Sequence, residues 1–281
     1  MFFKKNELLE FAYRQIRYTI LKRKFYGITS PFRKTPDFLV IGGKRCGTTT
    51  LFEFLKQHPM ISSSPFDHMG FFDDNYKLGM NYYKSFFPFK TKKNLQNLDY
   101  DVTTSYLTNH KVPERISRYL PHVKIIVILR NPTSRAWSDY NSTKVNLSNI
   151  ASFEEIIDYE IEKLNNFKKT KFVKDSPKIQ NEFNFLEKGI YVDYLKTWFS
   201  YFPRENFLIL STEEFAKDEN LIFQKIFNFL NIPNFEIKNL RRMSKGDYNE
   251  IELLIKSKLD IFFKSKNIEL FELLKLKFDW N

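Results

Sequence analysis

Apolar residues gather in three short runs, and each run is followed by a turn and then by a segment with helical spacing. The runs cover residues 37–43, 123–129 and 207–210, and the segments after them cover 48–57, 135–140 and 220–230. Short apolar runs bounded by turn residues are typical of buried strands. Buried strands that alternate with helices predict an α/β fold, with a central parallel sheet and helices on both faces.

The N-terminal residues are set apart from this pattern. Residues 6–26 are predicted to form a helix with a basic face opposite an apolar stripe of Leu9, Tyr13, Ile16 and Ile20. Pro31 and Pro36 then predict a linker. We therefore divide the chain into a basic helix and linker over 1–35 and one domain over 36–281. The helix either packs on the domain or contacts a membrane surface through anionic lipid.

One long segment breaks the alternation of strands and helices. Residues 141–188 contain no apolar strand and are rich in Lys, Asn and Glu. We expect a helical insertion and a surface loop there.

The composition bears on the size of the core, on the cellular compartment and on the kinds of site that the chain can form. Hydrophobic residues make up 42% of the 281 residues and include 31 Phe, so a sizeable core can form. No apolar run approaches the roughly 20 residues that span a bilayer, and the N-terminus lacks the apolar region of a signal peptide. The lone cysteine, Cys46, permits no intramolecular disulfide. We expect a cytoplasmic protein, which would be peripheral at the membrane surface if the N-terminal helix contacts lipid. We expect no metal, because the four histidines lack metal-ligand spacing.

The net charge of +12 is concentrated near the N-terminus. Residues 1–36 carry nine basic and two acidic side chains, which leaves +5 for the other 245 residues. The chain also lacks a helix-turn-helix, zinc-finger or RNA-recognition signature. A basic binding module therefore stays a minor alternative, and we expect no nucleic-acid partner.

The turn after the first predicted strand has the features of a phosphate-binding loop. Its sequence over 42–50 is GGKRCGTTT. Glycines let backbone N–H groups approach an anion, and the following helix start adds further free N–H groups. Positive charge comes from Lys44 and Arg45, and hydroxyl donors come from Thr48, Thr49 and Thr50. We therefore expect the phosphate contacts to come from Lys44, Arg45, Cys46, Gly47, Thr48, Thr49 and Thr50.

This loop departs from the Walker A pattern of kinases and ATPases. Gly42 and Gly47 have the Walker spacing, but Thr48 stands where the lysine should be. A P-loop kinase or NTPase is therefore an alternative that the sequence disfavours.

A second anion site is predicted after the second strand. Arg130 ends that strand, and Ser138 follows eight residues later within the next helix. Ligands of open α/β sheets bind at the carboxyl ends of the strands, where both side chains would converge. Two anion sites at one sheet edge suit a nucleotide that carries phosphate on its 5′ and 3′ sides.

These two motifs resemble those of the sulfotransferase superfamily. The stretch PDFLVIGGKRCGTTTLFEFLKQHPMI is similar to the family's 5′-phosphosulfate loop, and RNPTSRAWSDY is similar to its 3′-phosphate motif. Further likenesses lie in the segments FFD (71–73), KVPERI (111–116) and FDW (278–280), so the resemblance covers about residues 36–281. The likeness is strongest to the heparan sulfate 3-O- and N-sulfotransferase branch and its bacterial relatives.

The resemblance implies a function and a set of site residues. It implies transfer of a sulfuryl group from PAPS (3′-phosphoadenosine-5′-phosphosulfate) to a hydroxyl or amine of a carbohydrate, polyanionic or lipid-linked. Adenosine 3′,5′-bisphosphate would be the product, and no metal is implied. Arg45 would stabilise charge on the leaving phosphate, while Arg130 and Ser138 would hold the 3′-phosphate. Lys245 and Gly246 resemble part of the family loop that closes over the nucleotide.

The chain departs from this branch at three positions. Arg45 replaces a lysine, Val102 replaces another lysine, and His68 stands where the branch has a glutamate base. A free imidazole titrates at about pH 6.5, so His68 can serve as the general base. Asp67 and Asp73 are the alternative bases, and we otherwise expect them to contact the acceptor. These departures also leave open a catalytically inactive, glycan-binding relative.

Overall fold

The structure of the protein is a computed structural model. It describes residues 23, 25–62, 66–145, 147, 150–165, 183–238 and 248–280.

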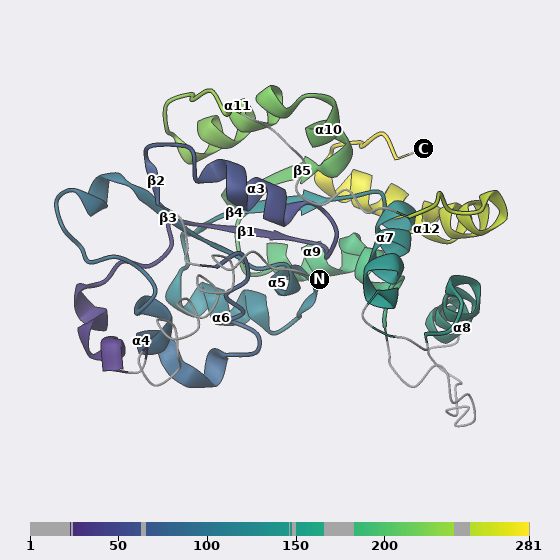
Figure 1. The fold of residues 1–281 in the computed structure, drawn as a ribbon, viewed down its shortest axis with the longest axis horizontal. Helices are drawn as coiled ribbons and strands as arrows, with labels where there is room; N and C mark the ends of the chain where they lie inside the picture. The colour runs from purple at the N-terminus through teal and green to yellow at the C-terminus, as the bar shows by residue number, and fades with distance from the viewer. Residues whose placement is uncertain are drawn as a thin grey trace, which may run out of the picture.

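A five-stranded parallel sheet forms the centre of the molecule, in the order β2-β3-β1-β4-β5 (Figure 1). Its strands are β1 (Phe38–Gly42), β2 (Ile61–Ser62), β3 (Leu98–Val102), β4 (Lys124–Leu129) and β5 (Phe207–Ser211). From β1 the chain moves to one side to form β2 and β3, and then to the other side to form β4 and β5. The carboxyl end of β1 therefore lies between those of β3 and β4, at the place where open α/β sheets bind ligands.

Helices cover both faces of the sheet. They are α3 (Thr48–Leu55), α4 (Gly79–Lys84), α5 (Ser105–Thr108), α6 (Val112–Tyr119), α7 (Pro132–Lys144), α8 (Phe153–Asn165), α9 (Tyr191–Phe199), α10 (Thr212–Lys217), α11 (Glu219–Leu230) and α12 (Leu253–Leu274). Short 3₁₀ turns complete the described structure: η1 (Gly27–Phe32), η2 (Tyr76–Leu78), η3 (Asn94–Gln96), η4 (Glu187–Gly189) and η5 (Arg204–Asn206). Figure 1 shows α3, α10 and α11 on one side of the sheet and α5, α6 and α9 on the other.

Alternate residues of β1 pack into two separate hydrophobic cores. Phe38 and Val40 pack into the cluster under α3 and α11. Leu39 and Ile41 pack into the larger cluster under α5, α6, α7, α9 and α12. All five residues of β1 are buried, as expected for a strand that is covered on both faces.

The predicted fold class is confirmed, and the three predicted strands are β1, β4 and β5 within one or two residues at each end. The helices after them, α3, α7 and α11, were also predicted, although α7 is longer than expected because Pro132 begins it. β3 was not predicted, because Asp99 and Asp101 interrupt its apolar pattern. Both carboxylates are buried with partners, so this strand carries charge into the interior.

The N-terminal prediction falls mostly outside the described residues. Of the helix expected over 6–26, the structure describes only residues 23, 25 and 26. Residues 27–34, expected as part of a linker, are packed on the domain. The 3₁₀ turn η1 contacts α4, and the buried Lys34 ammonium pairs with Asp99 of β3, with Nζ 2.6 Å from Oδ2.

Among the described helices, none has the length and apolarity that crossing a membrane would require.

Candidate functional site

The loop between β1 and α3 is held against β4 by close backbone packing. A side chain on Gly42 would place its Cβ 2.5 Å from the carbonyl oxygen of Ile128, so the position accepts glycine alone without a backbone shift. Gly47 has a φ of +95°, in the left-handed region that favours glycine. The two glycines thus serve different needs, close approach at Gly42 and a tight turn at Gly47.

The first turn of α3 offers free backbone donors to a ligand. The Leu51 N–H donates to the Gly47 carbonyl oxygen at the start of the helix, so the N–H groups of Thr48, Thr49 and Thr50 precede the helical ladder. Gly47, as the N-cap residue, has no side chain that could accept from them. By contrast, α7 and α10 are capped by the Asn131 and Ser211 side chains. The start of α3 therefore fits a phosphate or sulfate group.

The two sequence motifs meet directly in the structure. Arg45 Nε donates to Ser138 Oγ at 3.1 Å, although the two residues are 93 positions apart. Arg130 Nη1 donates to the Arg45 carbonyl oxygen at 3.1 Å. Arg45, Arg130 and Ser138 therefore form one cluster at the carboxyl edge of β1 and β4.

Arg45 adopts a backbone conformation that disfavours a side-chain-bearing residue. Its φ is +75°. Non-glycine residues in this region store strain of about 1–3 kcal/mol, and such strain concentrates at functional sites. The hydrogen bond from the Arg130 guanidinium to the Arg45 carbonyl oxygen holds this conformation in place.

Lys44 turns toward α7 rather than into the start of α3. Its Nζ lies 2.9 Å from Asp139 Oδ1, and the opposite carboxylate oxygen of Asp139 faces Arg135 Nη1 at 3.3 Å. Asp139 and Arg135 are almost completely buried, whereas about half of the Lys44 side chain is exposed. Sequence reasoning missed this triad, although the i, i+4 spacing of Arg135 and Asp139 in the same motif could have indicated it.

Cys46 is buried and helps to hold the loop in place. Its buried thiol lies 3.7 Å from the Tyr191 hydroxyl, which donates to the Arg130 carbonyl oxygen at 2.9 Å. The Thr212 hydroxyl is 2.6 Å from the Cys46 carbonyl oxygen. Burial raises the pKa of the Cys46 thiol to about 11, so the thiol stays protonated near neutral pH. Neither Tyr191 nor Thr212 was predicted, because they lie outside both motifs.

The C-terminal FDW segment packs against residues that hold the loop, including Tyr191. Trp280 Nε1 donates to Glu213 Oε2 at 3.0 Å, and Glu213 Oε1 accepts from the Asn131 N–H. The Trp280 ring also packs against Tyr191, with centroids 5.9 Å apart. This segment therefore supports the loop after β4.

His68 is exposed, and its segment lies next to the carboxyl end of β3, where the Gly70 N–H donates to Thr103 Oγ1 at 3.3 Å. A network below it centres on Asp101, which is fully buried and accepts from the hydroxyls of Thr103 (2.8 Å), Tyr83 (2.9 Å) and Tyr106 (3.1 Å). The Tyr106 hydroxyl in turn accepts from the N–H groups of Phe71 and Phe72. The backbone that follows His68 is thus tied to β3 through a buried carboxylate.

Burial changes the pKa of the Asp101 carboxyl. Loss of water raises its pKa to about 6, while the hydroxyl donors and the nearby His68 act in the opposite direction. Asp101 was not predicted as a site residue, although its place beside the missing family lysine pointed to this strand end.

The two predicted aspartates differ in their surroundings. Asp73 Oδ2 accepts from the Ser105 hydroxyl, and Oδ1 lies 2.6 Å from the Asp74 N–H. Asp67 is exposed. Asp73 is therefore oriented by its neighbours, whereas Asp67 is a surface carboxylate beside His68.

Two other predicted site residues, Lys245 and Gly246, lie outside the described residues. No group of three or more His, Cys, Asp or Glu side chains suited to a metal occurs in the described part of the chain.

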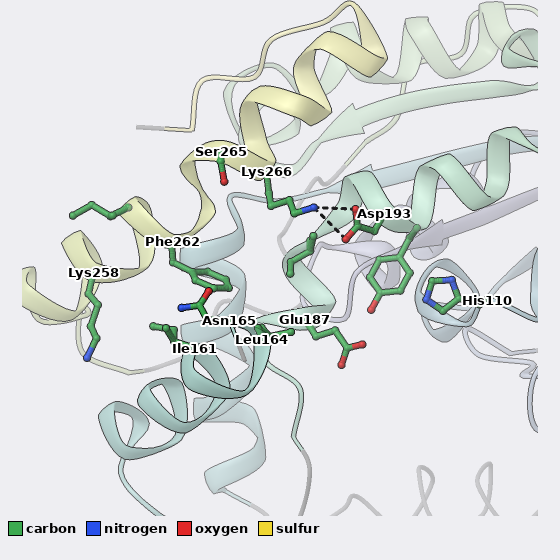
Figure 2. Close-up of a pocket in the computed structure, with 13 residues that line it drawn as sticks. His110, Ile161, Leu164, Asn165, Glu187, Asp193, Lys258, Phe262, Ser265 and Lys266 are labelled. Atoms are coloured by element: carbon green, nitrogen blue, oxygen red, sulfur yellow. Dashed lines mark hydrogen bonds and ion pairs between the residues drawn. The ribbon is translucent and has the colours of Figure 1, made fainter. Parts of the chain in front are cut away.

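A cavity of about 720 Å³ lies elsewhere, between α8, α9 and α12 (Figure 2). The described residues that line it include none of the 42–50 loop, Arg130 or Ser138. Its Lys266 ammonium is paired with Asp193 at 3.2 Å. This cavity is therefore separate from the loop at the carboxyl edge of the sheet.

Solved sulfotransferase structures share this fold. A sulfotransferase from Alicyclobacillus acidocaldarius superposes with a TM-score of 0.67 at 22% identity, covering 87% of this chain and 98% of that chain. A mouse sulfotransferase solved in complex with PAP has a TM-score of 0.51 at 18% identity, covering 90% and 93%.

Curated relatives are larger proteins that act on heparan sulfate, as their names state. Bifunctional heparan sulfate N-deacetylase/N-sulfotransferase 1 of Caenorhabditis briggsae is 26% identical over 274 residues. Human heparan sulfate glucosamine 3-O-sulfotransferase 6 is 30% identical over 207 residues. The alignments cover 86% and 71% of this chain but only 30% and 53% of those proteins.

The resemblance inferred from the two motifs is thus confirmed by independent comparison. The family model described as "Sulfotransferase domain" matches residues 35–265, which is most of the chain. This chain therefore belongs to the sulfotransferase family.

Proposed function

We propose that this protein transfers the sulfuryl group of PAPS to a carbohydrate acceptor. The observation that carries the proposal is the cluster of Arg45, Arg130 and Ser138 beside the uncapped start of α3. It combines backbone donors for one phosphate group with a second cationic position on the next loop. A donor with phosphate on its 5′ and 3′ sides needs such a pair of sites.

The residues of the loop account for binding of the donor. Free N–H groups of Thr48, Thr49 and Thr50 fit the 5′-phosphosulfate. Arg130 and Ser138 fit the 3′-phosphate, and a guanidinium can bind phosphate through two parallel hydrogen bonds. The complex of the mouse relative with PAP supports this choice of nucleotide.

Arg45 is suited to stabilise the leaving group. In the transfer, the acceptor oxygen or nitrogen forms a bond to sulfur while the bond from sulfur to the bridging phosphate oxygen breaks. The electron pair of that bond leaves with adenosine 3′,5′-bisphosphate. A guanidinium that is fixed before the reaction stabilises this developing charge without reorganisation. The strained Arg45 backbone and its bond to Ser138 supply that fixation.

His68 is the proposed general base. It is exposed to an incoming acceptor and sits on a segment that Asp101 and Tyr106 anchor to β3. The imidazole would take the proton from the acceptor hydroxyl or amine as the bond to sulfur forms. Since β3 and β4 flank β1, the proposed base and the donor loop share one edge of the sheet.

The acceptor class is inferred from the relatives. Both names given above specify heparan sulfate, so a polyanionic carbohydrate is the first acceptor to test. A lipid-linked saccharide in the cytoplasm is the second.

Isothermal titration calorimetry with adenosine 3′,5′-bisphosphate tests the donor site. We expect micromolar binding by the wild type, at least tenfold weaker binding of adenosine 5′-monophosphate, and loss of that difference in Arg130→Ala. Arg118→Ala is the matched control, because Arg118 is exposed and pairs with Glu114 of the same helix. Equal affinity for the two nucleotides in the wild type would contradict the proposal and favour a kinase-type nucleotide site.

A further inference from the structure

An exposed apolar patch lies on the far side of the first 3₁₀ turn. Four large side chains form it, with exposed fractions of 70% for Phe25, 73% for Ile28, 68% for Phe32 and 43% for Phe89. Exposed apolar side chains that gather on neighbouring segments mark an interaction site more often than isolated exposed residues do. We refer to these four residues as the apolar patch.

The orientation of η1 is determined by its small residues, which point inward. Gly27 and Ser30 are buried against α4, and the Ser30 hydroxyl donates to Asn81 Oδ1 at 2.7 Å. A Cβ on Gly27 would lie 3.3 Å from the Asn81 carbonyl oxygen, so a larger residue would push the turn away. The turn therefore buries its small residues and presents Ile28 and Phe32 outward.

The patch continues onto the segment after α4. The Lys90 N–H donates to the Phe32 carbonyl oxygen at 2.8 Å, and Arg33 forms an isolated antiparallel bridge with Phe89. The Arg33 guanidinium also lies over the Phe89 ring, 4.2 Å from its centroid. Two chain segments thus form one surface at the periphery of the molecule, beside α4 (Figure 1).

The surroundings of the patch are basic. Residues 25–37 and 84–98 contain one acidic side chain, Asp37, and six basic ones: Arg33, Lys34, Lys84, Lys90, Lys92 and Lys93. Lys90, Lys92 and Lys93 are exposed. Lys34 does not add to this charge, because it is buried and paired with both Asp37 and Asp99.

We propose that the apolar patch and Lys90, Lys92 and Lys93 dock the protein on an anionic lipid surface. Apolar side chains would enter the interfacial region while the lysines contact lipid phosphates. A second copy of this chain fits less well, because a two-fold interface at this patch would bring the same lysines together without an acidic partner.

Co-sedimentation with vesicles tests the proposal on the full chain. The probes are vesicles of phosphatidylcholine alone and vesicles of phosphatidylcholine and phosphatidylglycerol in equal parts. We expect binding to the mixed vesicles, reversal by added salt, and little binding to phosphatidylcholine alone. Absence of binding to the mixed vesicles would overturn the proposal.

Two variants locate the binding surface. Lys90→Gln/Lys92→Gln/Lys93→Gln should weaken binding to the mixed vesicles about a hundredfold, since each lysine near an anionic surface contributes roughly a fivefold effect. Phe25→Ser/Phe32→Ser should weaken it at least tenfold. All five side chains are exposed, so the thermal unfolding midpoint should stay unchanged, which separates lost docking from lost folding.

A matched control uses exposed apolar residues elsewhere. Leu254→Ser/Ile261→Ser on α12 removes side chains that are 84% and 75% exposed, and it should leave vesicle binding within twofold of the wild type. Equal binding by wild type and both patch variants would place the lipid contact elsewhere and overturn the proposal. A change from dimer to monomer in the patch variants, measured by light scattering, would instead identify the patch as a contact between copies.

Discussion

At the scale of single residues, the candidate chemistry depends on two side chains with very different environments. Arg45 is held by a strained backbone and two hydrogen bonds, so it is prearranged before any ligand binds. His68 is exposed and depends on the neighbouring segment for its position. Substitution at each residue should therefore affect different steps.

Replacement of the proposed base should reduce catalysis more than donor binding. We expect His68→Ala to lower turnover by about 10²–10⁴-fold, the usual contribution of a general base, with less than a twofold change in the affinity for adenosine 3′,5′-bisphosphate. Turnover is measured as sulfate transfer from PAPS to a heparan-type acceptor. His122→Ala, at another exposed histidine, is the control. Full activity of His68→Ala would transfer the role of the base to Asp67 or Asp73.

The thiol of Cys46 should be chemically inert in the folded protein. It is completely buried, and its raised pKa of about 11 keeps it protonated near neutral pH. We expect iodoacetamide at neutral pH to leave Cys46 unmodified in the native protein and to alkylate it after denaturation, as measured by mass spectrometry. Rapid alkylation of the native protein would show that the loop opens to solvent.

At the scale of elements, β3 and the segment 66–73 behave as one unit. Asp101 at the end of β3 binds the Tyr106 hydroxyl of α5, and that hydroxyl binds two backbone N–H groups of the segment. Tyr83 of α4 reaches the same carboxylate. The network links three elements through one buried charge.

Loss of one hydroxyl should destabilise this unit measurably. Tyr106→Phe would leave the N–H groups of Phe71 and Phe72 buried without their acceptor, at a cost of about 1–3 kcal/mol for an unsatisfied group. We expect a lower free energy of unfolding in urea and reduced turnover, because the His68 segment loses its anchor. Tyr119→Phe is the control, since the Tyr119 ring is 48% exposed.

Substitution of Asp101 should change how the free energy of unfolding depends on pH. Its pKa is raised from 3.8 to about 6, so the folded state holds a proton that the unfolded state has already released between those values. Stability from this group is therefore present at low pH and is lost as pH rises through that window. Relative to Asp101→Asn, the wild type should lose unfolding free energy between about pH 4 and pH 6, as measured by urea titration at each pH. A pH-independent difference would show that Asp101 titrates normally.

At the scale of the whole molecule, a buried ion pair ties the chain before β1 to the sheet. Lys34 pairs with Asp99 and also donates to the carbonyl oxygens of Asn94 and Asn97. Both members of the pair are buried. Residues 27–34 are therefore part of the domain's packing, which matters for any truncated variant.

Removing only the lysine of this pair should lower the free energy of unfolding more than removing both charges. Lys34→Met leaves the Asp99 carboxylate buried without its cation, which usually costs about 3–5 kcal/mol. Lys34→Met/Asp99→Asn should recover part of that loss, because the second change removes the uncompensated charge. Unfolding in guanidinium chloride measures both, and Lys56→Met, at a surface pair with Glu53, is the control. Equal unfolding free energies for the single and double variants would mean that the charge is not the cause.

Local pattern in the sequence determined a large part of this protein. The strands β1, β4 and β5 were predictable because uninterrupted apolar runs bury both faces of a parallel strand. The loop at 42–50 and the Arg130 motif were predictable because anion binding needs glycines, cations and hydroxyls at a strand end. These features are local, so one segment of sequence contains the whole signal.

Contacts between distant segments were decided only by the tertiary structure. The pairing of Lys44 with Asp139 and the burial of Asp101 under three hydroxyls depended on residues far along the chain. β3 escaped prediction for the same reason, since its carboxylates are compensated by Lys34 and by Tyr83 and Tyr106. A sequence pattern records the polarity of each residue, whereas partners that neutralise a buried charge become visible only when the chain has folded.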